Sequence, residues 1–122
     1  MTDKYVEIIK PDDWHVHLRE KNVLEKVLPF SYQNFKRALV MPNLKTPITT
    51  LDMAASYYEE IVANIPSRIE FTPLLTLYLS DEISVNLIKT LSNHRFIKAI
   101  KMYPKGATTN SELGVSDFNS YY

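Results

Sequence analysis

The sequence predicts an α/β protein built around a parallel β-sheet, and three observations support this. Short apolar runs alternate with amphipathic helical patterns along the 122 residues. The centres of these runs recur roughly every 25 to 35 residues, as expected for repeated strand–helix units. The runs are nearly continuous in apolar residues, which is typical of parallel strands buried on both faces. The order β-α-β-α-β-α-β is compatible with two folds, a doubly wound sheet and a (β/α)8 TIM barrel.

Four segments are predicted strands because they are apolar and bounded by turn-forming residues. The second stops at Pro42 and the fourth at Pro104, since proline interrupts the hydrogen-bond ladder of a strand. Residues 5–9 are a candidate further strand ahead of the first. The four strands are expected at 14–18, 37–41, 71–79 and 96–103.

Three amphipathic helices are predicted between these strands. Asn22 is the expected N-cap of the first helix, and Pro29 should kink or end it. Thr49 should cap the second helix, and the third follows Ser80-Asp81. The apolar faces comprise Val23, Leu24, Val27 and Leu28; Leu51, Ala54, Ala55, Tyr58, Ile61, Val62 and Ile65; and Ile83, Leu87, Ile88 and Leu91.

Residues 116–122 resemble the opening of a fourth helix rather than a finished element. The 122 residues are therefore expected to form one domain portion, without a separate second domain. A TIM barrel typically takes about 250 residues, so this portion would be about the first half of a barrel.

Composition excludes several classes of protein. The 14 Lys and Arg balance the 14 Asp and Glu, which argues against nucleic-acid binding driven by bulk charge. The chain has no cysteine, which excludes disulfides and thiolate metal sites and suits a reducing compartment. No apolar run approaches 18 residues and the N-terminus lacks a signal-peptide pattern. A cytoplasmic protein without a membrane or nucleic-acid partner is expected.

The most specific local feature is the pair His15 and His17 around Val16. Alternate residues of a strand share a face, which would place the two imidazoles about 6.6 Å apart at Cα. Two neutral imidazoles at that spacing can bind one metal ion. The alternative is a pair of hydrogen-bonded polar side chains at a strand end.

Two basic residues are further candidates. Arg19 lies on the same side as the histidines, where its guanidinium could bind a carboxylate or phosphate, although the sequence alone favours a surface ion pair with Glu20 or Asp13. Lys101 lies in an apolar run, where burial favours a neutral amine that can add carbon dioxide and form a metal-bridging carbamate. Alternatively, Lys101 extends along the strand to reach solvent. Lys98 is a rival on the opposite strand face.

Polar residues also follow the predicted strands. Asn43 comes just after the second strand, and Thr108-Thr109 follow the fourth. Ligands of parallel α/β proteins bind at this edge of the sheet. His94 is expected to be a solvated loop residue, and residues 57–60 to be helix surface and core edge without a chemical role.

Several blocks of the sequence, taken together, resemble the dihydroorotases, and specifically the short, homodimeric bacterial type. The similarity runs from about residue 6 onward, and the first block is highly specific whereas a bare His-x-His would not be. The blocks are KPDDWHVHLR at 10–19, VMPNL at 40–44, KMYP at 101–104 and ATTNS at 107–111.

This resemblance implies a zinc-dependent amidohydrolase with a TIM-barrel fold. His15 and His17 would bind the more buried of two Zn²⁺ ions, and Lys101, rather than Lys98, would be the carboxylated lysine that bridges both. Arg19 and Asn43 would bind the substrate carboxylate. Thr108 and Thr109 would lie on a loop that closes over the substrate.

The implied reaction is the reversible hydrolysis of dihydroorotate to N-carbamoyl-L-aspartate in pyrimidine biosynthesis. Further histidine ligands and a proton-transferring aspartate come from later strands in the family, and no histidine follows Lys101 here. The 122-residue chain alone is therefore expected to be inactive, and to need the remaining half of the barrel. The alternatives are another cyclic amidohydrolase, such as a hydantoinase or allantoinase, and a non-catalytic dihydroorotase-like subunit.

Overall fold

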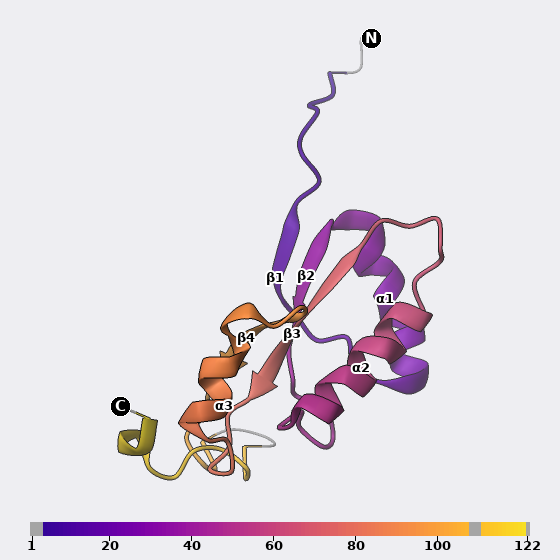
Figure 1. Cartoon of the computed structure of the whole chain (residues 1–122). Coiled ribbons are helices and arrows are strands. Elements are labelled where there is room, and N and C mark those ends of the chain that lie inside the picture. Colours follow the sequence, from indigo (N-terminus) through magenta and orange to yellow (C-terminus); the bar gives the residue numbers. More distant parts are fainter. Residues whose placement is uncertain (1–3, 108–110, 122) are drawn as a thin grey trace.

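The computed structural model describes residues 4–107 and 111–121, which form a four-stranded parallel sheet (Figure 1). The strands are β1 (Asp12–Val16), β2 (Arg37–Val40), β3 (Thr72–Tyr78) and β4 (Ile97–Lys101). They lie in the order β1-β2-β3-β4, and each pairs in parallel with the next. A doubly wound sheet reverses its strand order at a switch point, whereas a barrel adds strands sequentially. The observed order is that of a barrel segment.

Helices connect the strands as predicted, with differences at their ends. The helices are α1 (Lys21–Asn34), α2 (Leu51–Ala63) and α3 (Val85–Thr90), with short 3₁₀ helices η1 (Leu91–Asn93) and η2 (Phe118–Tyr121). The prediction that Asn22 caps α1 was wrong, because the N-cap is Glu20. Thr49 does not cap α2 either. The neighbouring Thr50 does so, accepting a hydrogen bond from the backbone N–H of Met53 at 3.2 Å.

Two other elements differ from their predictions. Pro29 does not end α1, which continues to Asn34. Leu24, Leu28 and Ser31 are buried on both sides of this proline, and their packing offsets the hydrogen bond that its missing N–H removes. The predicted start of a fourth helix is the 3₁₀ helix η2.

Residues 5–9 do not form a strand. They lie in the extended segment that leaves the sheet before β1 (Figure 1), and Tyr5 and Ile9 are 88% and 91% exposed. Alternating apolar residues form a strand only where a neighbouring strand completes their backbone hydrogen bonds. No such neighbour lies beside this segment in the described part of the chain.

The main core lies between the sheet and the helices. Leu24 and Leu28 of α1, Ala54 and Ile61 of α2, and Val40 of β2 are each at most 1% exposed within one apolar cluster. Val16, Leu77 and Ile100 also pack into that cluster, so they mark the helix-covered face of their strands. Because side chains alternate along a strand, their neighbours in sequence point to the opposite face.

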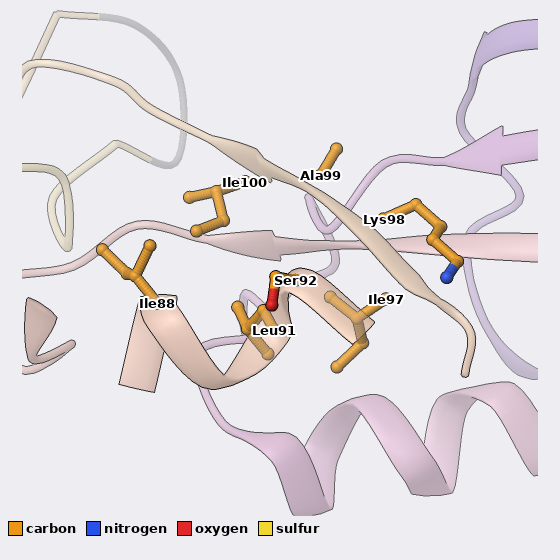
Figure 2. Close-up of a pocket in the computed structure, with 7 residues that line it drawn as sticks. All are labelled: Ile88, Leu91, Ser92, Ile97, Lys98, Ala99 and Ile100. Atoms are coloured by element: carbon orange, nitrogen blue, oxygen red, sulfur yellow. The ribbon is translucent and has the colours of Figure 1, made fainter. Parts of the chain in front are cut away.

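β1 and β4 are the outer strands of the described sheet. Beside β4 lies an apolar groove of about 350 Å³, which α3 and η1 border (Figure 2). Its lining residues are Ile88, Leu91, Ser92, Ile97, Lys98, Ala99 and Ile100. Among the described residues, no helix has the length and hydropathy needed to cross a membrane.

Candidate active site

Three strand ends bring the predicted site residues to one face of the sheet. Val16 and Ile100 point to the helices, so His15, His17 and Lys101 point to the other face. Asn43 follows β2, the strand that lies next to β1. The candidate site therefore lies at the carboxyl ends of β1, β2 and β4, on the face without helices.

The two histidines lie at an irregularity near the end of β1. The backbone N–H of His15 donates to Asp13 Oδ1 at 2.9 Å, and the pairing of β1 with β2 shifts register between Asp13 and Val16. This local side-chain bond replaces regular strand pairing. The imidazole centroids of His15 and His17 lie 5.3 Å apart.

His17 has the surroundings of a ligand rather than of a packed polar side chain. Its Nδ1 atom is buried and has no hydrogen-bond partner among the described residues. Burial lowers the pKa of His17, and the positive charges of Lys101 and Arg19 and the neighbouring His15 lower it further. The imidazole is thereby kept neutral, which is the form that binds a metal ion.

Asn43 connects the two cationic side chains of the site. Lys101 Nζ donates to Asn43 Oδ1 at 2.8 Å, and Arg19 Nη1 donates to the carbonyl oxygen of Asn43 at 3.1 Å. The segment after β2 is fixed by Pro42, whose carbonyl accepts hydrogen bonds from the backbone N–H groups of Leu44 and Ile48. Asn43 thus stands at a defined position between Arg19 and Lys101.

The two candidate lysines, Lys98 and Lys101, have different surroundings in the structure. Lys101 is half-buried and lies 5.1 Å from the ring centroid of Tyr103, on the site face. Lys98 is exposed, and its Nζ donates to the carbonyl oxygen of His94 at 2.6 Å, away from the histidine pair. Of these two lysines, Lys101 is the one whose charge contributes to lowering the pKa of His17.

His94 is not the solvated residue that its loop position suggested. It is half-buried, its ring meets Phe96 edge-on at 4.7 Å, and its Nδ1 accepts the backbone N–H of Ile97. His94 therefore stabilises the start of β4, at the opposite end of that strand from Lys101.

Tyr57 and Glu60 contact the site through the β1–α1 loop (residues 17–21), which sequence reasoning missed. Arg19 and Lys21 adopt left-handed backbone conformations, with φ of 59° and 53°. For a residue with a side chain this costs roughly 1–2 kcal/mol. The Tyr57 hydroxyl donates to the carbonyl oxygen of Arg19 at 2.6 Å, and Glu60 Oε1 accepts the backbone N–H of Lys21 at 2.7 Å.

Neither residue carries a signal in the sequence. Tyr57 and Glu60 stand in the run Tyr-Tyr-Glu-Glu of α2, which has the pattern of an ordinary helix surface. Their role depends on a loop that lies 38 and 39 residues earlier in the chain.

Thr108 and Thr109 lie outside the described residues. The base of their loop (residues 104–115, the β4 loop) is well defined, because Pro104 and Val115 form a bridge beyond β4. Lys105 N donates to the Val115 carbonyl at 3.0 Å, and Val115 N donates to the Tyr103 carbonyl at 2.9 Å. Both ends of the loop are therefore held at the carboxyl end of β4.

The residues present fit part of a metal site. The described residues contain no group of three or more His, Cys, Asp and Glu arranged around one ion. They do provide two adjacent imidazoles and, at Lys101, an amine that becomes an anionic oxygen donor if it is carboxylated. The buried, unpartnered Nδ1 of His17 is the specific observation that favours a metal ligand.

Comparisons with known proteins give one consistent result. The chain is 50% identical to a dihydroorotase of Picosynechococcus over 92% of its length, and 45% identical to that of Cupriavidus necator over all 122 residues. It spans about a third of the length of these relatives. No family model matches the sequence.

Solved structures agree in fold and in sequence. The crystal structure of a dihydroorotase from Campylobacter jejuni matches 92% of this chain with a TM-score of 0.80 and 35% identity. A Saccharomyces cerevisiae dihydroorotase in complex with 5-fluoroorotic acid matches with a TM-score of 0.78 and 37% identity. The chain covers 32% and 31% of these structures. The resemblance seen in the sequence is confirmed, and the described fold is part of a TIM barrel.

Proposed function

We propose that this chain, which is related to the dihydroorotases over nine-tenths of its length, forms part of a zinc-dependent dihydroorotase. Its reaction is the reversible hydrolysis of dihydroorotate to N-carbamoyl-L-aspartate, in the synthesis of pyrimidines. The observation that carries this proposal is the convergence of His17, Arg19, Asn43 and Lys101 at three strand ends. Together these side chains offer a metal-binding imidazole, an anion-binding guanidinium and a reactive amine.

His15, His17 and Lys101 are the proposed metal-binding residues. The Lys101 ammonium would first lose a proton to solvent. Nζ of the neutral amine would then attack carbon dioxide, so that a new N–C bond forms, one C–O π bond opens to give the second carbamate oxygen, and a second proton leaves for solvent. The resulting carbamate would supply two oxygens as metal ligands beside His15 and His17. Bound zinc would lower the pKa of a hydrolytic water and polarise the amide carbonyl. The carbamate nitrogen would keep one N–H, which could still donate to Asn43 Oδ1.

Arg19 and Asn43 are the proposed carboxylate-binding residues. Arg19 uses one Nη1–H on the Asn43 carbonyl, and the guanidinium has further N–H groups for a carboxylate. Asn43 Oδ1 faces Lys101, which leaves the Nδ2 amide group as its donor to the substrate. Both side chains hold the substrate through an anionic group that does not react. They thereby orient the cyclic amide.

Thr108 and Thr109 are proposed to contact the substrate from the β4 loop. What supports this proposal is that the base of the loop is attached at the carboxyl end of β4, the strand that carries Lys101. Closing a loop over the site would exclude water other than the reacting one.

The rest of the barrel is the proposed partner of this chain, within one single-domain enzyme. The outer strand β4 and the apolar groove beside it offer unpaired backbone groups and apolar surface, which a further strand and helix would cover (Figure 2). The remaining histidine ligands and the proton-transferring aspartate would come from that part. We propose a homodimeric, cytoplasmic enzyme, and no turnover by the 122 residues alone.

A chimera tests the proposal. The chain replaces the segment of the Cupriavidus necator dihydroorotase that it matches, about 35% of that protein. We expect zinc-dependent hydrolysis of dihydroorotate and little hydrolysis of hydantoin or allantoin. Lys101→Ala and His17→Ala should lower kcat at least a thousandfold and release zinc, whereas the matched control Lys98→Ala should retain activity. Preference for hydantoin or allantoin, or a folded chimera without zinc and turnover, would contradict the proposal.

A further inference from the structure

The β1–α1 loop forms two hydrogen bonds with one turn of α2, accepting one from Tyr57 and donating one to Glu60. Tyr57 and Glu60 stand three residues apart on that helix, so their side chains lie on the same face. Tyr57 binds the carbonyl of Arg19, and Glu60 binds the N–H of Lys21. These are the two residues whose backbones are left-handed, so each unfavourable conformation has its own bond to α2.

Each bond satisfies a backbone group for which the described residues offer no other hydrogen-bond partner. Glu20, the N-cap of α1, makes no side-chain capping bond, and Glu60 accepts the first N–H of α1 instead. The Glu60 carboxylate also places negative charge at the helix N-terminus, where it is favourable. Tyr57 is only 4% exposed, and burial raises the pKa of its hydroxyl, which keeps it protonated as a donor.

We propose that Tyr57 and Glu60 are positioning residues, which hold the β1–α1 loop so that Arg19 stays directed at Asn43 and at the substrate carboxylate. The inference rests on the proposed function for the identity of that substrate. The left-handed backbone of Arg19 sets the direction in which its side chain leaves the loop. If this backbone relaxed to an ordinary conformation, the guanidinium would move away from the Asn43 carbonyl oxygen, to which Nη1 donates at 3.1 Å. Tyr57 and Glu60 bond to the backbone of Arg19 and Lys21 and not to His15 or His17, so zinc content serves as a separate measure of the metal site.

Limited trypsin digestion of the 122-residue chain tests the loop directly. The Lys21–Asn22 bond lies where Glu60 holds the loop, and the exposed Lys4–Tyr5 bond serves as the internal standard. We expect Tyr57→Phe and Glu60→Ala to speed cleavage at Lys21 several-fold. Glu60→Gln, which keeps a carbonyl acceptor, should restore most of the resistance.

The control is Tyr58→Phe, the same deletion on the next residue of α2. The Tyr58 ring stacks on Phe96 at 4.2 Å, away from the β1–α1 loop. This variant should be cut at Lys21 at the unmodified rate. Equal cleavage of Tyr57→Phe and Tyr58→Phe would overturn the proposal.

Steady-state kinetics of the chimera test the positioning of Arg19. We expect Tyr57→Phe to raise KM for dihydroorotate about tenfold, with kcat and zinc content within twofold of the unmodified chimera. A fall in kcat or zinc content at constant KM would show a merely structural role, and so would faster cleavage at Lys21 with unchanged KM. Either result would overturn the inference. If the unmodified chimera does not hydrolyse dihydroorotate, the proposed function fails, and the trypsin result still decides whether α2 holds the loop.

Discussion

Gly114 is the glycine whose replacement should disturb the β4 loop most. An alanine Cβ at this position would lie 2.6 Å from the Tyr103 carbonyl oxygen, 2.9 Å from that of Ser111 and 3.0 Å from the backbone nitrogen of Lys105. All three neighbours are backbone atoms, which cannot move aside by rotating a side chain. Gly114→Ala must therefore shift the loop base that binds Val115.

Two responses to this clash are available, and their costs can be compared. Keeping the loop closed stores overpacking strain of about 1–3 kcal/mol. Opening its base loses the two hydrogen bonds that pair Val115 with Lys105 and Tyr103, at about 1 kcal/mol each, and part of the burial of Val115, which is 1% exposed. Opening the loop base therefore costs more free energy than moderate overpacking strain in the closed loop. In Gly114→Ala the loop should stay closed, but its closed state should be destabilised by about 2 kcal/mol.

Amide hydrogen exchange measures this difference. A destabilisation of about 2 kcal/mol raises the open population about thirtyfold, so the Val115 and Lys105 amides should exchange about thirty times faster in Gly114→Ala. Gly106→Ala is the matched control, because nothing lies within 4 Å of its added Cβ and only the φ of 72° is unfavourable. That strain is about 1 kcal/mol, which predicts an increase of about fivefold. Unchanged exchange in Gly114→Ala, or a larger effect of Gly106→Ala, would refute this reasoning.

Three other predictions follow from single contacts. Asn43→Ala removes the acceptor of Lys101 and the proposed amide donor to the substrate, so the KM of the chimera should rise at least tenfold while zinc remains bound. Asp81 accepts two hydrogen bonds from Ser116, which lower its pKa below the usual 3.8. The stability that these hydrogen bonds add is fully present above the usual pKa of 3.8 and is lost as pH falls through the lower pKa of Asp81 in the folded protein. The Ser116 amide resonance should therefore titrate with a midpoint below 3.8. Leu28→Ala, at a fully buried position of α1, should lower the free energy of unfolding by about 2–5 kcal/mol in urea titrations.

The strand–helix alternation was predictable because burial is periodic in the sequence. Leu24 and Leu28 recur at helical spacing, and both are completely buried against the sheet. Element ends were less predictable, since Thr49 and Thr50 are equally good caps by residue type. The helix begins after Thr50 because its side chain is the one that reaches the N–H of Met53.

The candidate site was predictable where it follows strand periodicity. His15 and His17 share a face because they alternate, and Lys101 joins them because β4 ends at the same edge. The contribution of α2 could not be predicted, because it depends on the left-handed backbone of Arg19. Arginine rarely adopts a left-handed backbone, so the residue type at position 19 does not predict this conformation.

The charges around His17 connect the proposed metal site with the proposed carboxylation of Lys101. In the described structure, the positive charges of Lys101 and Arg19 are among the causes that lower the pKa of His17 and disfavour its protonation. The same positive field opposes a divalent cation. The proposed carboxylation would turn the +1 charge of Lys101 into −1, so that a neighbour that repels a metal ion would become a ligand. Arg19 would remain cationic, and the proposed substrate carboxylate would balance its charge. The proposed roles of Lys101 and Arg19 are thus complementary: one cation must be converted before zinc is held firmly, and the other must be kept for the substrate.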